Sequence, residues 1–294
     1  MNRAANQRSL PSMGEEAKDS IIESIGRLQE TFERREAAKI YQLPIWPDPA
    51  RGVPNEIIRS ALFAAIQAQG RDYLDNAEIA CQDGFSIRYT GQRLDQSHLD
   101  VFEGVMHIAR GVHVGNRICF SAHRLLRLIG RSTGQSDHAW LHRTLKQLTA
   151  TAVEIKDTRS NRLFWGSLLP RGAADEGSAQ YVVEVNRDLA KLFDRGFTQV
   201  DWEQRRQLRR KPLAQWLHLY YSSHAKPHPV SVGWIRDKSG SKTSSLRAFR
   251  QNLRAALDEV RSVGVIASWE VADDLVHVVR NPSPSQLRHL ARQG

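Results

Sequence analysis

Basic and amide side chains recur at helical spacing in one stretch near the end of the chain: Arg247, Arg250, Gln251 and Arg254. Residues three or four positions apart lie on one side of a helix, so these side chains share a direction. An arginine can donate two hydrogen bonds to O6 and N7 of guanine, a pairing worth about 1–3 kcal/mol of discrimination between bases. The stretch therefore predicts a face that reads base edges in duplex DNA.

The element expected to position this face is a helix over Ser245–Val263. Ser244 or Ser245 can accept a hydrogen bond from the first free backbone N–H groups, and Gly264 suits the left-handed residue that ends a helix. An apolar stripe at spacings of three, four and seven residues predicts the buried side of the helix. The stripe consists of Leu246, Phe249, Leu253, Leu257 and Val260.

The sequence on either side of this helix predicts a small domain around it. Trp234–Lys238 is expected to be a short helical turn, followed by the breaker residues Ser239-Gly240-Ser241. Val265–Val271 and Leu275–Arg280 alternate apolar and polar residues, as the strands of a hairpin do. Short helix, turn, arginine-bearing helix and hairpin is the order of a winged helix-turn-helix, whose second helix lies in the major groove. The alternative is a surface helix whose arginines are merely solvated.

The same order occurs about 110 residues earlier in the chain, which favours a duplicated module. Ser121–Ile129 is a predicted helix that ends at Gly130, and a turn leads to a longer helix over Asp137–Ala150. Strands are expected to follow. The longer helix is predicted to be buried through Leu141, Leu145 and Leu148, with His142, Arg143 and Lys146 on the opposite face.

The predicted DNA contacts follow from these two basic faces. Lys242 precedes the second basic helix, and we expect it and the hairpin residues to bind phosphate, which sets register without reading sequence. The predicted contacts are His142, Arg143 and Lys146 in the first module, and Lys242, Ser244, Arg247, Arg250, Gln251 and Arg254 in the second.

Other elements around the first module are predicted from apolar periodicity. Helices are expected at Asn55–Gln67 and Ser97–Arg110. Arg171–Ser178 is rich in glycine, alanine and acidic residues, and is expected to be a loop at the tip of the wing. Short strands are expected at Ala77–Cys81, Phe85–Tyr89, Val153–Asp157, Arg162–Leu169 and Gln180–Asn186.

Length and charge favour two domains that meet a polyanion. The 294 residues are enough for two cores, and the formal net charge is +10. From Arg187 onward, 19 Lys and Arg stand against 10 Asp and Glu, and cations that neutralise phosphates release condensed counterions. An anionic membrane is the alternative, but the basic residues lie in a folded pattern rather than on a free amphipathic helix. The absence of a membrane-spanning run, a signal peptide and a disulfide framework predicts a cytoplasmic protein.

The sequence contains no motif that asks for catalysis. Gly240-Ser241-Lys242-Thr243 lacks the upstream glycine of a phosphate loop, and no nucleophile-elbow Gly-x-Ser-x-Gly occurs. Cysteine and histidine residues nowhere have zinc spacing; His138 and His142 lie one helical turn apart but lack an acidic partner. We therefore expect no enzymatic activity, no cofactor and no metal site.

The first 54 residues are predicted to lie apart from both modules. Met1–Met13 is polar and is expected to be disordered. Glu15–Lys39 has the apolar stripe of a helix, which we expect to dock on the body rather than on a partner. Prolines hold the following stretch extended, so that Leu43, Ile45 and Trp46 are presented to whatever lies beside them. These residues either cover the protein's own core or form an exposed peptide anchor.

Several stretches carry a family likeness: Arg51-Gly52-Val53-Pro54-Asn55 with Arg59-Ser60-Ala61-Leu62-Phe63, Tyr89-Thr90-Gly91-x-x-Leu94-Asp95-Gln96, and Pro212-Leu213-Ala214-Gln215-Trp216-Leu217. Their combination, in a likeness that runs from Gln42 to Arg280, resembles TrfA-type plasmid replication initiators of broad-host-range plasmids. The resemblance implies two tandem winged-helix domains that bind directly repeated origin sequences, called iterons, and do not hydrolyse nucleotide.

The resemblance also implies partners. Monomers would occupy the iterons, while homodimers would restrain replication. The bound initiator would help to melt an AT-rich segment, whose single strand is a further possible ligand, and would recruit the host initiator DnaA and the replicative helicase.

The stretch from Gln42 to Trp46 is similar to the Gln-Leu-Ser-Leu-Phe type of sliding-clamp-binding peptide. That likeness implies that Gln42 orients the backbone, while Leu43, Ile45 and Trp46 fill a pocket on the host clamp. The sequence departs from the pattern where Pro44, Ile45 and Trp46 replace Ser, Leu and Phe. Because Trp is bulkier than Phe, the departure implies a weaker or differently seated contact.

These observations predict an α+β chain with two tandem winged helix-turn-helix domains. Residues 1–54 would hold the N-terminal helix and the extended linker with its clamp-binding-like peptide, residues 55–186 the first domain, and residues 187–294 the second. The predicted function is an iteron-binding plasmid replication initiator. The alternative is a winged-helix transcriptional regulator that binds operator DNA, and an enzyme acting on DNA ranks third.

Overall fold

The structure is a computed structural model that describes residues 24–28, 30, 42–67, 71–82, 84–113, 117–158, 163–175, 177–283, 286–287 and 291. The chain divides into two compact units, Met1–Ile40 and Tyr41–Gly294. In the first unit, residues 24–28 and 30 are helical. The remainder of the helix expected over Glu15–Lys39, and the stretch Met1–Met13, lie outside the described residues.

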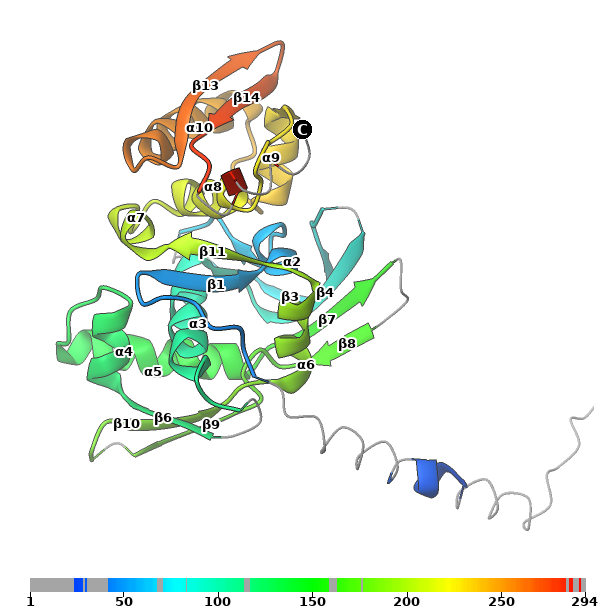
Figure 1. Cartoon of the computed structure of the whole chain (residues 1–294), viewed down its shortest axis with the longest axis vertical. Helices are drawn as coiled ribbons and strands as arrows, with labels where there is room; N and C mark the ends of the chain where they lie inside the picture. Colours follow the sequence, from blue (N-terminus) through cyan, green and yellow to red (C-terminus); the bar gives the residue numbers. More distant parts are fainter. Residues whose placement is uncertain are drawn as a thin grey trace, which may run out of the picture. The chain divides into compact units, whose positions relative to one another are not determined.

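The first basic helix, α5, belongs to a module of three helices and a three-stranded sheet (Figure 1). Asp95 caps α3 by accepting hydrogen bonds from the backbone of Ser97 and His98, and Ser121 caps α4. The strand order is β6-β10-β9, so the strand before α4 pairs with the last strand of the module. The elements are α3 (Gln96–Ala109), β6 (Arg117–Ser121), α4 (Ala122–Leu128), α5 (Gln135–Thr149), β9 (Arg171–Asp175) and β10 (Gln180–Glu184).

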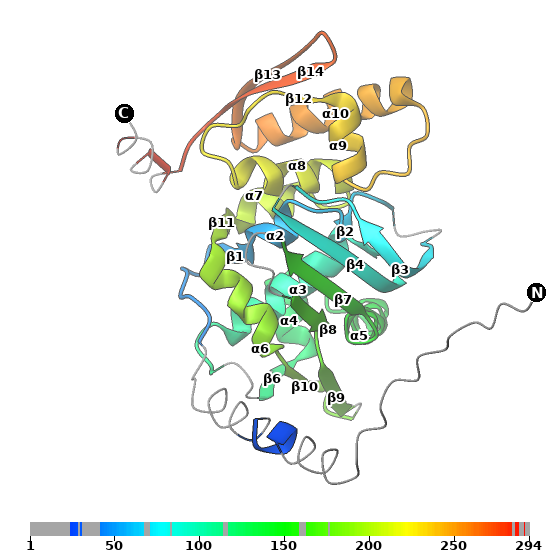
Figure 2. The same cartoon turned by 90° about the vertical axis from the view of Figure 1, so that its right-hand side faces the viewer.

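The second module repeats this connectivity around the other basic helix, α10. Its strand order is β12-β14-β13, so again the first strand pairs with the last and the last with the middle one. Asp273 and Asp274, with φ of 48° and 62°, make the two-residue turn between β13 and β14. Figure 2 shows α8 and α10 side by side with the hairpin beyond α10. The elements are α8 (Pro212–Ser222), β12 (Val230–Ser231), α9 (Val232–Lys238), α10 (Leu246–Ser262), β13 (Ile266–Ala272) and β14 (Leu275–Arg280).

The hairpin that was expected to complete the first module lies in a different sheet. The strands that directly follow α5 pair with strands that precede α3, in the antiparallel order β3-β4-β7-β8. Ile87, Ile155 and Phe164 from three of these strands are buried in one core. An alternating pattern shows that a strand has a buried side but not which sheet it joins, so the sequence prediction was wrong here. The strands are β3 (Tyr73–Ile79), β4 (Phe85–Gln92), β7 (Ala152–Asp157) and β8 (Leu163–Gly166).

The stretch Arg171–Ser178, expected to be a loop, contains strand β9. All five residues of β9 are exposed, and among the described strands β9 pairs only with β10, from Arg171 opposite Glu184 to Asp175 opposite Gln180. A strand with neither face buried has no alternating pattern, which explains why its sequence looked like a loop.

The helix expected over Asn55–Gln67 is only one turn long. It ends at Ile58, after which the backbone forms β2 (Phe63–Ala64), parallel to β5 (Leu94–Asp95). The apolar residues that follow Ser60 are nevertheless buried. A short continuous apolar run is compatible with a buried helix or a buried strand, and periodicity cannot distinguish the two. The short helix is α2 (Asn55–Ile58).

The segment before the first module is part of its core rather than a separate linker. Strand β1 (Ala50–Pro54) pairs antiparallel with β11 (Phe197–Asp201), almost 150 residues later. The larger hydrophobic cluster runs from Leu43 through Trp202 and includes Leu219, whereas the second cluster combines Ala65 with residues from Leu208 onward. The predicted divisions after residues 54 and 186 therefore do not coincide with the division of the cores. In the chain, the two modules are separated by α6 (Arg187–Ala190), the 3-10 helix η1 (Lys191–Arg195) and α7 (Trp202–Gln207), whose buried residues Leu189, Phe193 and Trp202 belong to the larger core.

The predicted clamp-binding residues lie largely inside this core. Trp46 is 1% exposed; its indole donates a hydrogen bond to His107 Nδ1 at 3.0 Å and stacks on Phe193. Gly52 admits the ring, because a Cβ there would come within 2.6 Å of the indole. Leu43 is also buried, whereas Ile45 is 77% exposed.

This burial contradicts the placement of Leu43 and Trp46 as accessible anchors for a clamp pocket, and it supports the alternative that they cover the protein's own core. Gln42 is exposed, and its backbone forms an isolated antiparallel β-bridge with that of His113. The prolines do hold the segment extended, but the surface beside it belongs to the same chain.

A buried arginine joins the two modules. Arg205, at the end of α7, is 1% exposed and pairs with Asp100 of α3 at 2.7 Å. Its remaining N–H groups donate to Gln96 on α3 and to the backbone carbonyl of Gln215 on α8. Burial raises the pKa of the neighbouring Glu103 to about 7.

We predict that Arg205→Ala lowers the free energy of unfolding by about 3–5 kcal/mol, because the substitution leaves the buried Glu103 and the partly buried Asp100 without their cationic partner. Denaturant titration of the full chain measures the loss. Arg206→Ala is the matched control: Arg206 is exposed and pairs with Glu203, so its loss should cost at most about 1 kcal/mol. Equal stability of the two variants would contradict the assignment of Arg205 as the residue that joins the two modules.

We predict that Trp46→Ala destabilises the chain by about 3–5 kcal/mol through loss of packing and the cavity left behind. Ile45→Ala, at the exposed neighbouring position, should change the free energy of unfolding by no more than about 0.5 kcal/mol. Thermal or denaturant unfolding measures the stability of the two variants against that of the wild type. A Trp46 variant as stable as the wild type would show that the indole is not a core residue.

Candidate nucleic-acid interface

Helix α10 has the orientation that its sequence predicts. Ser245 Oγ accepts a hydrogen bond from the Ala248 backbone at 3.4 Å, and Gly264 follows the helix with φ of 87°. Four of the five predicted stripe residues are fully buried and Leu246 is partly buried. The buried four are Phe249, Leu253, Leu257 and Val260. Packing of this stripe on α8 and the hairpin leaves the arginine-bearing side of α10 outward.

Arg247, Gln251 and Arg254 are exposed along that side of α10. Within the described part of the chain, neither Arg247 nor Arg254 makes an ion pair or a side-chain hydrogen bond. Their guanidinium donors are therefore available to a ligand. An exposed guanidinium group has the donors for two hydrogen bonds to a guanine edge in a major groove.

Arg250 is held differently from its neighbours. Its guanidinium pairs with the Asp274 carboxylate at 2.6 Å, and its side chain is 35% exposed. The pair ties α10 to the turn between β13 and β14. Sequence reasoning missed Asp274, although an acidic turn at the end of the predicted hairpin was a visible signal.

The residues before α10 lie at the surface, as expected for phosphate contacts. Ser244 is exposed. The ammonium group of Lys242 lies 2.7 Å from the Asp72 carboxylate, and both side chains are largely exposed. A solvated ion pair of this kind is weak, so Lys242 can exchange its partner for a phosphate.

The basic side of α5 is only partly as predicted. Arg143 and Lys146 are exposed. His142 is half-buried, with its ring 3.3 Å from the Tyr181 hydroxyl of β10. His142 therefore packs between the helix and its hairpin, beside a hollow of about 480 Å³ that also reaches Lys146 and Ala173 of β9.

The turn between α4 and α5 is held by a residue that the sequence did not single out. The Arg131 guanidinium lies 3.7 Å from the centre of the Trp140 ring and pairs with Asp137 at 2.8 Å. Hydrogen bonds from Ser132 and Arg131 keep the pKa of Asp137 below its usual value. The spacing of three residues between Asp137 and Trp140 was the available signal, since it puts both on one side of α5.

Other kinds of site find little support in the described residues. No group of three or more histidine, cysteine or acidic side chains is placed to hold a metal ion there. Within the same residues, no helix has the length and apolar content needed to cross a bilayer. The clustered, exposed cations of α10 and α5 are therefore the candidate interface.

The chain is similar to several known proteins. The plasmid replication initiator protein TrfA of Escherichia coli is 30% identical over 249 residues, which cover 82% of this chain and 64% of that protein. The chain thus spans less than two thirds of its relative's length. The crystal structure of domains 2 and 3 of RctB has a TM-score of 0.50 at 11% identity, covering 74% of this chain and 95% of that one, and shows a similar fold. The crystal structure of the Pi initiator protein in complex with iteron DNA has a TM-score of 0.47 at 14% identity, over 62% and 91% of the two chains.

The family itself is identified from the sequence as a whole. The model of the TrfA protein family matches residues 14–280, nearly the whole chain. With the Escherichia coli relative, this match establishes that the chain belongs to the TrfA family.

Proposed function

We propose that this chain is a plasmid replication initiator that binds directly repeated origin DNA through two winged-helix domains. The observation that carries the proposal is that one order of helices and sheet strands occurs twice, with β7 and β8 inserted after α5 in the first module, and each time with exposed cations on the second helix. Strand, helix, helix and hairpin, with the first strand paired to the last, is the arrangement of a winged helix. Membership of the TrfA family supports the role at an origin.

In this proposal α10 is the principal reading helix. The first residues of a recognition helix contact base edges; Arg247 and Gln251 lie in the first half of the 17-residue helix, and Arg254 lies at its midpoint. Arg250 contacts DNA either by breaking its ion pair with Asp274 or by donating to DNA and to Asp274 at the same time. Lys242 and Ser244 hold phosphates at the start of the helix, and so set the register.

The first winged helix makes a second contact with the same duplex. Arg143 and Lys146 on α5 supply its cations, while His142 supports the hairpin more than the DNA, because it packs on Tyr181. The formal charge of +10, nearly all of it from residue 187 onward, supports a polyanionic partner chiefly for the second domain.

Partners beyond duplex DNA follow from the proposed role of an initiator. They are the host initiator DnaA, the replicative helicase and single-stranded AT-rich origin DNA, together with a second copy of the chain in a restraining homodimer. Contact with the host sliding clamp through the segment 42–46 would require Leu43 and Trp46 to leave the core, and that contact is not part of this proposal.

Footprinting of the purified chain across its own replicon tests the proposed function. We expect protection of several directly repeated sequences of equal spacing at the origin. Deletion of those repeats should abolish replication of a minimal replicon supplied with the protein. Protection of one palindrome over a promoter, with replication unaffected, would instead identify a transcriptional regulator.

We predict that Arg254→Ala weakens binding to the protected repeat by about 1–3 kcal/mol, because a bidentate contact to a base is lost. Binding to unrelated duplex should change little. Fluorescence anisotropy with both duplexes measures the two affinities. Arg261→Ala, on the same side of α10 but two turns closer to its C-terminus and paired with Asp258, is the control that should leave both unchanged. An equal loss with both duplexes for Arg254→Ala would make that residue a phosphate contact.

A further inference from the structure

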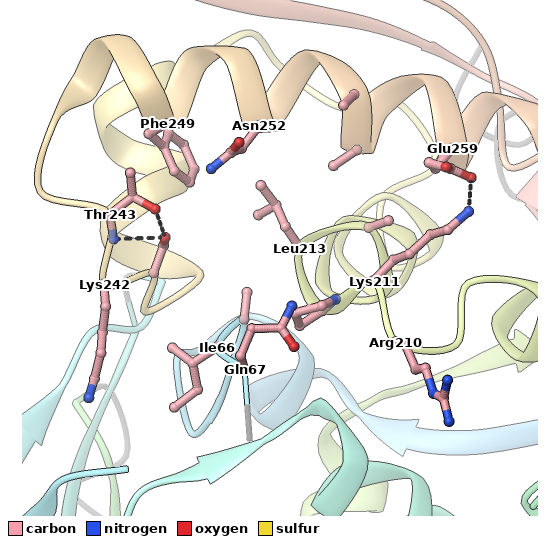
Figure 3. A pocket seen from close by; sticks show the side chains of 16 residues that line it. Ile66, Gln67, Arg210, Lys211, Leu213, Lys242, Thr243, Phe249, Asn252 and Glu259 are labelled. Carbon is pink, nitrogen blue, oxygen red and sulfur yellow. Dashed lines mark hydrogen bonds and ion pairs between the residues drawn. The ribbon is translucent and has the colours of Figure 1, made fainter. Parts of the chain in front are cut away.

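A short basic strip, Arg209-Arg210-Lys211, lies between the two basic helices. Residues of the strip line two hollows of about 660 and 280 Å³. The larger hollow is bounded on one side by α10, through Asn252 and Glu259 (Figure 3). The smaller is bounded by α5 through Trp140, and Arg210 lines both. Arg210 is the charged residue among the four that line both hollows, the others being Ile66, Gln67 and Pro212.

The strip lies on the inner flank of each helix. On the outer flank, α10 touches its own hairpin through Arg250 and Asp274, and α5 touches its own through His142 and Tyr181. The order across the surface is therefore hairpin, helix, strip, helix, hairpin. A duplex in contact with the exposed sides of both helices passes over the strip.

Positive charge in the strip is incompletely neutralised. Lys211 pairs with Glu259 at 2.5 Å, and Arg209 donates to the Gly130 carbonyl at 3.0 Å. Burial lowers the pKa of Arg209, and the like charges of Arg131 and Arg210 lower it further. The Arg210 side chain is exposed and makes no hydrogen bond or ion pair with the described residues. In Figure 3 it points away from Lys211 and Glu259.

The backbone at Arg210 is also unusual. Its φ of 67° lies in the left-handed region, which glycine and asparagine adopt far more readily than a long side chain. A strained residue persists when the surrounding structure imposes it, and such residues collect at functional positions. Because the Arg210 side chain is exposed and has no hydrogen-bond or ion-pair partner among the described residues, its free positive charge is the chemical feature of this position.

We propose that Arg210, with Arg209 beside it, binds the sugar-phosphate backbone of the duplex between the two major-groove contacts. The inference rests on the proposed function and adds residues outside both reading helices. A phosphate contact at this position fixes the spacing and direction of the two helices on DNA without reading sequence. An isolated exposed cation in a basic strip between two reading helices has the chemistry for that contact.

The test is the salt dependence of DNA binding by the full chain. Anisotropy titrations over a series of salt concentrations use two duplexes, one with the footprinted repeat and one of unrelated sequence. Loss of one phosphate contact lowers the slope of log affinity against log salt by about 1. We expect this decrease for Arg210→Gly and Arg210→Gln on both duplexes, with the ratio of specific to unrelated affinity unchanged. Arg210→Lys should keep the wild-type slope.

Two comparisons separate this role from a structural one. Arg210→Gly should melt at or above the wild-type temperature, because glycine adopts a positive φ without strain. Arg187→Gln removes an exposed arginine from α6, outside the strip, and should keep the wild-type slope.

If Arg210→Gly and Arg210→Gln both keep the wild-type slope of log affinity against log salt, this inference is overturned and the proposed function still stands. Failure of the wild type to bind either duplex would overturn both. A drop in slope with Arg187→Gln equal to that with Arg210→Gln would also overturn the assignment, since the effect would then be one of net charge.

Discussion

The guanidinium group of Arg205 is the point on which the arrangement of the two modules depends. Through one side chain, α7 contacts Asp100 and Gln96 of α3 and the backbone of α8. A buried cation tolerates little displacement, because each lost contact leaves a charge or a carbonyl desolvated. The helices that carry the candidate interface pack directly on α3 and α8, so their separation follows from this network.

Much of the candidate site follows from local sequence, and the tertiary pairing does not. The apolar stripe of α10 predicted its buried side, its bounds and the exposure of Arg247 and Arg254, since a single helix determines all of these. The pairing of β1 with β11 joins residues almost 150 positions apart, and no local pattern encodes it. The Arg250–Asp274 pair and the two hollows beside Arg210 likewise arise only when separate elements are brought together.

The same distinction explains the wrong placements. Extended backbone and apolar side chains were correctly predicted around Trp46, but those properties suit a core as well as a partner's pocket. The hairpin after α5 was correctly predicted as strands and assigned to the wrong sheet. In both cases the pattern gave the local conformation, and the identity of the neighbouring surface came only from the fold.

The ion pair between Arg250 and Asp274 has a consequence for recognition. For the Arg250 amino group that now donates to Asp274 to donate to a base or a phosphate instead, it must exchange the carboxylate that it already holds for an acceptor on the nucleic acid. The free-energy gain is then the difference between two partners, and it is small wherever the new acceptor is poorly placed. An internal competitor of this kind penalises ill-matched sequences more than well-matched ones, so one acidic side chain in a hairpin turn can sharpen selectivity without touching a base.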